Sequence, residues 1–133
     1  MTKRILVVCD KSGPEHELKR ALTRAASDLE IECAATRSEI VTLPRPCLII
    51  LDLMRSSEPA VELLGWLRNE PLYHAVPVFV LGSHDVKGEI TESLRLGANA
   101  CLLMEFAREQ VEPIAEGIAT YASLLATPAL GAC

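Results

Sequence analysis

The sequence predicts an α/β protein with one doubly wound, five-stranded parallel sheet. Two observations predict this fold class. Continuous aliphatic runs, ILVV at 5–8, CLIIL at 47–51 and VPVFVL at 76–81, have the composition of strands buried on both faces. Between these runs, apolar residues recur at helical spacing. Strands that alternate with helices form a parallel sheet through right-handed crossovers, with helices on both faces.

Two further strands complete the predicted sheet. Weaker β patterns occur at 31–35 (IECAA) and at 100–104 (ACLLM). In a sheet of this class the functional crevice lies at the carboxyl ends of the strands, beside the switch in strand order. The candidate site residues are those at these strand ends: Cys9, Asp10, Asp52, Gly82, Ser83 and Cys101 to Met104.

Helices are predicted between the strands, and serines mark the start of three of them. Ser12 forms an S-x-x-E capping pattern with Glu15 before a helix that carries Leu18, Leu22, Ala25 and Leu29. Ser57 precedes a helix that carries Val61, Leu64 and Leu67. Ser83 precedes a helix that carries Val86, Ile90 and Leu94 and stops at Gly97. A short helix is also expected at 37–43.

The last helix is predicted at 107–125. Its apolar stripe has the spacing of a face that packs on the core rather than of a cofactor-binding motif. The stripe consists of Val111, Ile114, Ile118, Tyr121 and Leu125. Because 133 residues are the usual size of a single domain, we expect one domain at 1–125 and a short tail at 126–133.

Composition favours a soluble, cytoplasmic protein that binds neither nucleic acid nor membrane. No apolar run in the sequence approaches the roughly 20 residues that span a bilayer, and the first residues reach an acid too early for a signal peptide. The 13 basic residues are dispersed and the formal charge is -5, which favours a cation or a protein as partner. The five cysteines lack the spacing of a metal site or a disulfide framework, so reduced thiols are expected.

Asp10 and Asp52 follow two strands that are expected to be neighbours in the sheet. Two carboxylates that converge repel each other unless a cation or a proton lies between them. A hard divalent ion such as Mg²⁺ suits two carboxylates, a carbonyl and several waters. In the alternative interpretation, both acids accept hydrogen bonds from nearby backbone N–H groups and bind no metal.

Four segments, KRILVVCD, LIILDLM, VPVFVLGS and LGANACLLMEF, resemble the conserved blocks of response-regulator receiver domains. The resemblance covers residues 3–122. The segment WLRNEPLYHAVPVFVLGS and the tail are most similar to stand-alone receivers of the phytochrome-associated type. The resemblance implies the flavodoxin-like receiver fold with strand order 2-1-3-4-5, a histidine kinase as partner, and phosphorelay signalling.

The resemblance also implies roles for the strand-end residues. It makes Asp52 the potential phosphoacceptor. It makes Asp10 and Asp52 ligands of Mg²⁺, together with the backbone carbonyl of Met54, and it places Cys9 where the family has a second acid. Cys9 is then either a small core residue or a thiol with a redox or metal-binding role.

Three residues that hold and sense the phosphoryl group in the family are replaced. Gly82 stands in place of Thr or Ser, Met104 in place of Lys, and Cys101 in place of an aromatic residue. Ser83 is a candidate substitute for the hydroxyl, although it is also placed to cap the next helix. Arg55 is a candidate for the missing positive charge, although an exposed loop arginine is the simpler interpretation.

The sequence thus predicts a single-domain, degenerate receiver that acts through protein–protein contacts rather than as an enzyme. The face formed by residues 84–125 is expected to bind partners and to support a homodimer. One alternative is a pseudo-receiver that works without phosphorylation. Another is a small phosphotransferase with Asp52 as nucleophile, but Met54 stands where such enzymes have an acid. A third is a small-molecule binder, but CDKSGPE is not a glycine-rich phosphate loop.

Overall fold

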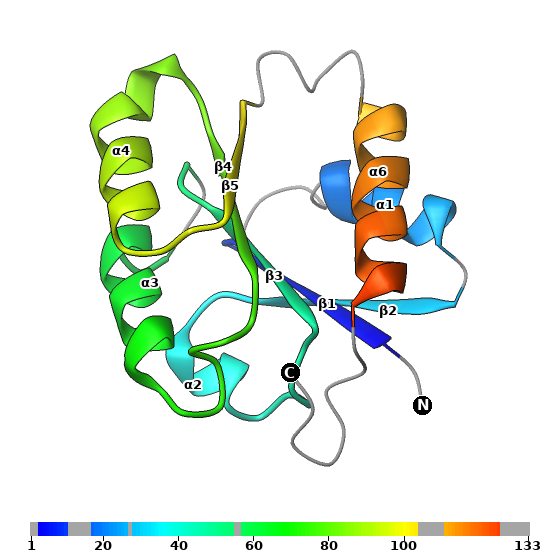
Figure 1. Ribbon diagram of the computed structural model, residues 1–133, viewed down its shortest axis with the longest axis horizontal. Coiled ribbons are helices and arrows are strands. Elements are labelled where there is room, and N and C mark those ends of the chain that lie inside the picture. Colours follow the sequence, from blue (N-terminus) through cyan, green and yellow to red (C-terminus); the bar gives the residue numbers. More distant parts are fainter. Residues whose placement is uncertain (1–2, 11–16, 27, 55–56, 104–110, 126–133) are drawn as a thin grey trace.

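A computed structural model of the chain describes residues 3–10, 17–26, 28–54, 57–103 and 111–125 (Figure 1). Its strands are β1 (Lys3–Val8), β2 (Leu29–Ala34), β3 (Leu48–Asp52), β4 (Val78–Gly82) and β5 (Ala100–Leu103). They form one parallel sheet in the order β2-β1-β3-β4-β5. The predicted fold class and strand order are therefore confirmed.

Helices cover both faces of the sheet. They are α1 (Glu17–Ala25), α2 (Arg37–Ile40), α3 (Ala60–Asn69), α4 (Lys87–Arg95) and α6 (Val111–Leu124), and a 3₁₀ turn, His84–Val86, precedes α4. In Figure 1, α3 and α4 lie on one side of the sheet and α1 and α6 on the other. In the part of the chain that is described, no helix is both long enough and apolar enough to cross a membrane.

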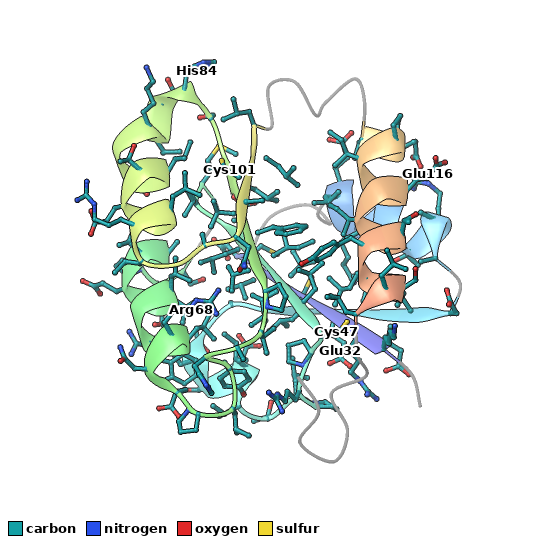
Figure 2. All side chains as sticks on the ribbon, in the orientation of Figure 1. Glu32, Cys47, Arg68, His84, Cys101 and Glu116 are labelled. Atoms are coloured by element: carbon teal, nitrogen blue, oxygen red, sulfur yellow. The ribbon has the colours of Figure 1, made fainter. Side chains whose placement is uncertain are left out.

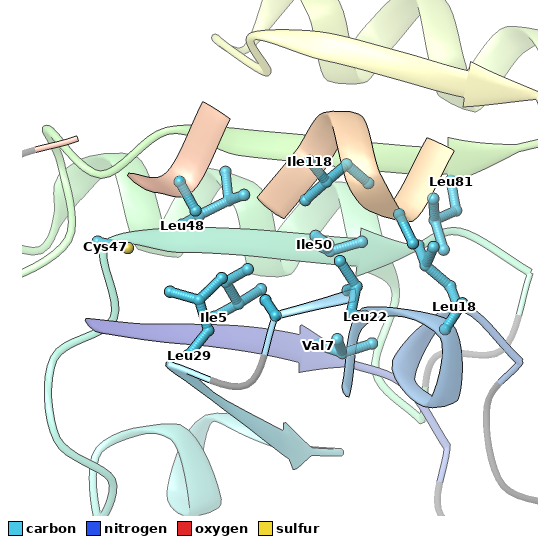
Figure 3. Close-up of a cluster of buried hydrophobic side chains, with 14 of the residues drawn as sticks. Ile5, Val7, Leu18, Leu22, Leu29, Cys47, Leu48, Ile50, Leu81 and Ile118 are labelled. Carbon is cyan, nitrogen blue, oxygen red and sulfur yellow. The ribbon is translucent and has the colours of Figure 1, made fainter. Parts of the chain in front are cut away.

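Alternate residues of the strands fill two separate cores. On β1, Ile5 and Val7 point toward α1 and α6, whereas Leu6 and Val8 point toward α3. Figure 3 shows the first core, where side chains of β1 and β3 meet Leu18 and Leu22 of α1 and Ile118 of α6. Because both faces of the strands are buried, neither face needs polar residues, which explains the continuous aliphatic runs.

Two helix boundaries differ from the prediction. Leu29 was expected on the first helix, but α1 ends at Ala25 and Leu29 begins β2, where it pairs with Lys3. The apolar spacing was therefore ambiguous, and strand pairing decided it. Ser57 does not cap α3, which begins at Ala60 after Pro59. A proline disfavours helical geometry at the residue before it, so the helix cannot extend back through Glu58.

Other boundaries agree more closely. The short helix expected at 37–43 ends at Ile40 and continues as hydrogen-bonded turns to Leu43. Ser83 does act as a cap, because its Oγ accepts a 3.2 Å hydrogen bond from the Asp85 backbone N–H. Gly97 follows the end of α4 with a φ of 105°, the left-handed geometry that favours glycine. The capping pair Ser12 and Glu15, and residues 107–110 of the last helix, lie outside the described residues.

Helix α6 packs on α1 and β1 and is capped from the first strand. Its buried residues are Ala115, Ile118 and Ala122. The Lys3 ammonium donates to the carbonyls of Ser123 at 2.7 Å and Ala122 at 3.2 Å, which places a positive charge at the negative end of the helix dipole. Tyr121 belongs to the predicted stripe but remains 37% exposed, with its ring 5.2 Å from that of Phe79.

Arg68 connects α3 to the segments that enter β4 and β5. Its guanidinium donates to the carbonyls of Val76 and Gly97, each at 2.8 Å, and to that of His74 at 3.1 Å. It also donates to Asn99 Oδ1, which in turn accepts from the Val78 backbone N–H at 2.9 Å. The position of Arg68 is labelled in Figure 2. One side chain therefore satisfies several carbonyls at the amino ends of two strands.

Candidate functional site

Five of the predicted site residues lie at the carboxyl ends of β1, β3 and β4: Cys9, Asp10, Asp52, Gly82 and Ser83. Val8 of β1 is the register partner of Leu51 in β3, which places Cys9 beside Asp52 in the parallel alignment. The Leu53 backbone N–H donates to the Leu81 carbonyl at 2.9 Å, so β3 and β4 remain paired just past Asp52. The three strand ends thus meet at one edge of the sheet, as the sequence predicted.

Asp52 is a buried carboxylate, only 2% exposed. Its Oδ1 accepts a 2.9 Å hydrogen bond from the Met54 backbone N–H, which fixes the orientation of the carboxylate. This contact agrees in part with the alternative in which strand-end acids are satisfied by the backbone. Asp10, in contrast, lies exposed at the end of β1. The two carboxylates therefore differ in solvation, although they follow neighbouring strands.

Cys9 is a buried thiol whose Sγ lies 4.0 Å from that of Cys33 on β2. The hydrogen bond with Cys33 and burial raise the pKa of Cys9, and the negative charge of Asp52 adds to this shift. The ammonium of Lys19, on α1, acts in the opposite direction and is the weaker effect. Cys9 is consequently a neutral thiol near neutral pH and not a thiolate.

The charge of Lys19 at this site is a feature that the sequence reasoning missed. Nothing in the residue spacing pointed to it, because the apolar stripe of α1 was used only to place the helix on the core. A helix that follows β1 begins at the carboxyl edge of the sheet, so charged residues in its first turns are candidates for the site. That topological signal was available from the sequence.

The predicted ligands of a divalent ion at this edge are oxygen atoms. Within the described ranges, no group of three or more His, Cys, Asp or Glu side chains is arranged to hold a metal. The oxygen groups that were predicted as ligands are the carboxylates of Asp10 and Asp52 and the carbonyl of Met54. Mg²⁺ is commonly held by one or two carboxylates and keeps several waters, so this set suits it better than it suits a soft metal.

Gly82 ends β4, and the space where its side chain would be is already filled. A Cβ at this position would lie 2.7 Å from Cδ1 and 2.8 Å from Cγ1 of Ile90 in α4, and 3.5 Å from Cδ1 of Leu53. An apolar side chain therefore occupies the volume that a Thr or Ser would need. Ser83, the candidate substitute, uses its hydroxyl to accept from Asp85 as a cap.

Cys101 is the second residue of β5 and lies on its α4 side, so it is not at the carboxyl end of the strand, where it was predicted. Its register partner is Val80, and both belong to the core between the sheet and α3 and α4. Burial raises the pKa of the Cys101 thiol, so it too is neutral near neutral pH. Figure 2 shows Cys101 on β5 and His84 at the end of the chain segment that leads into α4. Met104 and Arg55 lie outside the described residues.

An ion pair ties the loop after β3 to α2, and it was not predicted. Glu58 accepts from the Arg37 backbone N–H at 2.9 Å and from its Nε at 2.8 Å. These hydrogen bonds lower the pKa of Glu58. The Arg37 guanidinium also lies 5.7 Å from the centre of the Trp66 ring. Residues 21 positions apart carry no local signal of such a contact.

The chain is thus a doubly wound α/β protein in which two acids, Asp10 and Asp52, follow neighbouring strands at the switch in strand order. No model of a protein family matches the sequence, and a search of curated proteins gave no match. Among solved structures, the chain resembles response-regulator receiver domains over nearly its whole length. It has the receiver fold.

Three of these structures illustrate the likeness. The phosphorylated cyanobacterial phytochrome response regulator RcpA is 22% identical, with a TM-score of 0.77 over 97% of this chain and 100% of that one. The Mn²⁺-bound form of the response regulator Rcp1 is 22% identical, with a TM-score of 0.75 over 96% and 99%. A receiver domain from Rhodospirillum rubrum is 20% identical, with a TM-score of 0.73 over 94% and 96%. At these identities the likeness establishes the fold.

Proposed function

We propose that this chain is a receiver protein of two-component phosphorelay signalling, with Asp52 as its potential phosphoacceptor. The observation that carries the proposal is a buried carboxylate at the end of the central strand of a 2-1-3-4-5 sheet, with the end of β1 beside it. A receiver accepts a phosphoryl group and passes information by protein contact. The proposal therefore describes a signalling protein rather than a turnover enzyme.

The proposed transfer needs a nucleophile and positive charge around the phosphoryl oxygens. An oxygen of the Asp52 carboxylate forms a bond with phosphorus while the bond from phosphorus to the phosphohistidine nitrogen breaks, and the nitrogen keeps that electron pair. We propose Asp10, Asp52 and the Met54 carbonyl as the residues that would hold Mg²⁺. When bound, this ion neutralises charge on the phosphoryl oxygens.

The site supplies less than a complete set of donors for this reaction. Gly82 offers no hydroxyl, and Cys9 offers a neutral thiol in place of a carboxylate. Removal of one preorganised donor commonly lowers a rate by roughly 10²- to 10³-fold. We therefore expect phosphoryl transfer to Asp52 to be slow. The Lys19 ammonium is a described positive charge that acts near this edge.

We further propose that residues 84–125 form the surface for partners. A histidine kinase or another signalling protein is the expected partner class, and a homodimer through the same face is a second expectation. Support comes from apolar side chains of this segment that reach solvent, since Leu94 of α4 is 46% exposed and Tyr121 of α6 is 37% exposed. The cytoplasmic location and the 1–125 domain with a 126–133 tail remain predictions.

A second candidate function is a pseudo-receiver that works without phosphorylation. The specific observation in its favour is Ile90, which fills the space beside Gly82 where a phosphoryl-sensing hydroxyl would be needed. In that case the 84–125 face binds its partner in one constant arrangement. Both candidates use the same fold and the same partner surface, and they differ only in whether Asp52 is modified.

The decisive experiment adds an acyl phosphate with Mg²⁺ to the full chain and measures its intact mass. A mass increase of one phosphoryl group that disappears in Asp52→Asn supports the phosphoacceptor role. Asp28→Asn, which changes an exposed acid in the turn just before β2, is the matched control and should be labelled like wild type. No label on wild type, with acyl phosphate still present at the end, contradicts the phosphoacceptor role and leaves the pseudo-receiver. Release of inorganic phosphate far faster than in a protein-free control, with no accumulated label, would instead indicate an enzyme.

A further inference from the structure

Gly82 is required for space and not for its backbone conformation. Among the glycines that the structure describes, Gly97 is the one with a positive φ, so the geometry of Gly82 is open to any residue. A Cβ added at Gly65, Gly88 or Gly117 would meet nothing within 4 Å. At Gly82 the same atom would meet Ile90 at 2.7 Å. The contact with Ile90 is therefore the physical reason for a glycine here.

The conflict cannot be relieved by moving only the tip of the isoleucine. Ile90 Cγ1 lies 2.8 Å from the hypothetical Cβ, and this atom is bonded directly to Cβ of Ile90. Moving it requires a change in χ1, which for a β-branched residue in a helix is held near one rotamer. A side chain at position 82 and Ile90 in its present position therefore exclude each other, unless α4 moves.

The same point in space contacts the segment that follows Asp52. Leu53 Cδ1 lies 3.5 Å from the hypothetical Cβ, and Leu53 itself is 7% exposed. Helix α4 thus meets the ends of β3 and β4 through the side chains of Ile90 and Leu53. The side chains of Ile90 and Leu53 carry no hydrogen-bonding group, so this contact itself offers a phosphoryl group on Asp52 nothing polar through which to pull on α4.

We infer that Ile90 is a positioning residue that holds α4 in one place against β4, so that the α4 part of the partner surface is insensitive to the chemical state of Asp52. The inference rests on the proposed function, because it assigns that surface to partners. Figure 1 shows the arrangement, with α4 beside β4 and β5 on the face of the sheet that it shares with α3. The α4 part of the partner surface is then the same whether or not Asp52 is phosphorylated.

The first test is a double-mutant cycle between positions 82 and 90. Gly82→Ala should lower Tm by roughly 3–10 °C, because it overpacks the contact. Gly88→Ala, in α4 with open space around it, is the matched control and should raise Tm by roughly 2–4 °C. Ile90→Ala alone lowers Tm by leaving a cavity. In Ile90→Ala, the additional Gly82→Ala change should be neutral or stabilising, because it fills that cavity.

Two results of this cycle would overturn the inference. One is a Gly82→Ala change that raises Tm as Gly88→Ala does. The other is additivity, in which Gly82→Ala costs the same with and without Ile90. Neither result depends on phosphorylation, so the cycle tests the contact even if Asp52 proves inert. An inert Asp52 would contradict the phosphoacceptor proposal alone.

The second test compares amide hydrogen exchange of residues 87–95 before and after labelling Asp52 with an acyl phosphate and Mg²⁺. Wild type should show no change in these residues at full labelling. The variant Gly82→Thr with Ile90→Ala restores a hydroxyl and removes the obstruction, and its α4 exchange should respond to labelling. A change in α4 of labelled wild type would overturn the inference while supporting the phosphoacceptor role of Asp52.

Discussion

The Arg68 guanidinium and the Asn99 side chain meet in a 3.0 Å hydrogen bond that joins α3 to the segment entering β5. Arg68 also donates to the carbonyls of Val76 and Gly97. Without the guanidinium, the partly buried carbonyl of Val76 and the more exposed carbonyl of Gly97 would lose a charged donor. We expect Arg68→Ala to lower the free energy of unfolding by about 2–3 kcal/mol.

Urea unfolding measures this effect, and two further variants sharpen it. Arg68→Lys keeps the charge but cannot reach the same acceptors with one ammonium, so it should lie between wild type and Arg68→Ala. Arg95→Ala is the control, because Arg95 is 71% exposed and its pair with Glu92 should contribute less than about 0.5 kcal/mol. Equal losses for Arg68→Ala and Arg95→Ala would contradict the assigned role.

The ion pair of Glu58 with Arg37 predicts a pH-dependent contribution to stability. Hydrogen bonds from Arg37 hold the pKa of Glu58 below its usual range. The unfolded-state pKa is roughly 4.3, so the pair stabilises the fold above that pH. The contribution is lost as pH falls through the folded-state pKa. Glu58→Gln should be about 0.5–1 kcal/mol less stable than wild type at pH 7.

Urea unfolding of wild type and Glu58→Gln checks this prediction. The measurements run from about pH 3 to about pH 7, which spans the pKa of roughly 4.3 of a Glu side chain in an unfolded chain. The difference between the two proteins should shrink as pH falls below about 4. Glu92→Gln, which removes one member of an exposed pair, should differ from wild type by less than about 0.5 kcal/mol at every pH. A Glu58→Gln difference that stays constant with pH would show that the carboxylate charge does not contribute.

The glycines in open space predict gains in stability. Gly65 in α3 and Gly117 in α6 both lie inside helices, and a Cβ added at either residue would have no atom within 4 Å. Alanine at either site should raise the free energy of unfolding by about 0.5–1 kcal/mol, because it restricts the unfolded chain. Gly97→Ala is the opposite case. Its φ of 105° and the Arg68 Nε at 3.1 Å should make alanine cost about 1–2 kcal/mol. Thermal unfolding ranks the three variants, and a stabilising Gly97→Ala would contradict the structure.

The neutral thiol beside Asp52 suggests a variant that tests the proposed metal site. Cys9→Asp would add a second carboxylate at the end of β1, next to Asp52 in the sheet register. Two adjacent carboxylates repel each other without a cation, so this variant should be less stable than wild type in chelator. Addition of Mg²⁺ should then raise its Tm more than that of wild type.

Cys9→Asn is the matched control, since it has nearly the same shape as Cys9→Asp but no charge. Its Tm should respond to Mg²⁺ no more than that of wild type. Thermal unfolding with chelator and with Mg²⁺ measures both variants. Equal Mg²⁺ responses in the Asp and Asn variants would contradict a cation site at this edge.

The sequence by itself determined the sheet and the location of the site. The strands were predictable because a parallel strand with helices on both faces must be apolar on both faces, and the runs at β1, β3 and β4 are short and continuous. The place of Asp52 followed from the same pattern, because an acid that ends such a run lies at the carboxyl edge of the sheet. These are local signals, carried by neighbouring residues.

Only the tertiary structure decided which side chains of different elements meet at the two ends of the sheet. The contact of Ile90 with Gly82, the hydrogen bonds of Arg68 and the pair of Arg37 with Glu58 join residues on different elements. From the sequence, Gly82 could be described only as a position that lacks a hydroxyl. The structure shows that the Ile90 side chain of α4 occupies the space beside it. Such contacts depend on how helices sit against the sheet. The periodicity of apolar residues does not encode these contacts, because they are set by packing between segments that are far apart in the sequence.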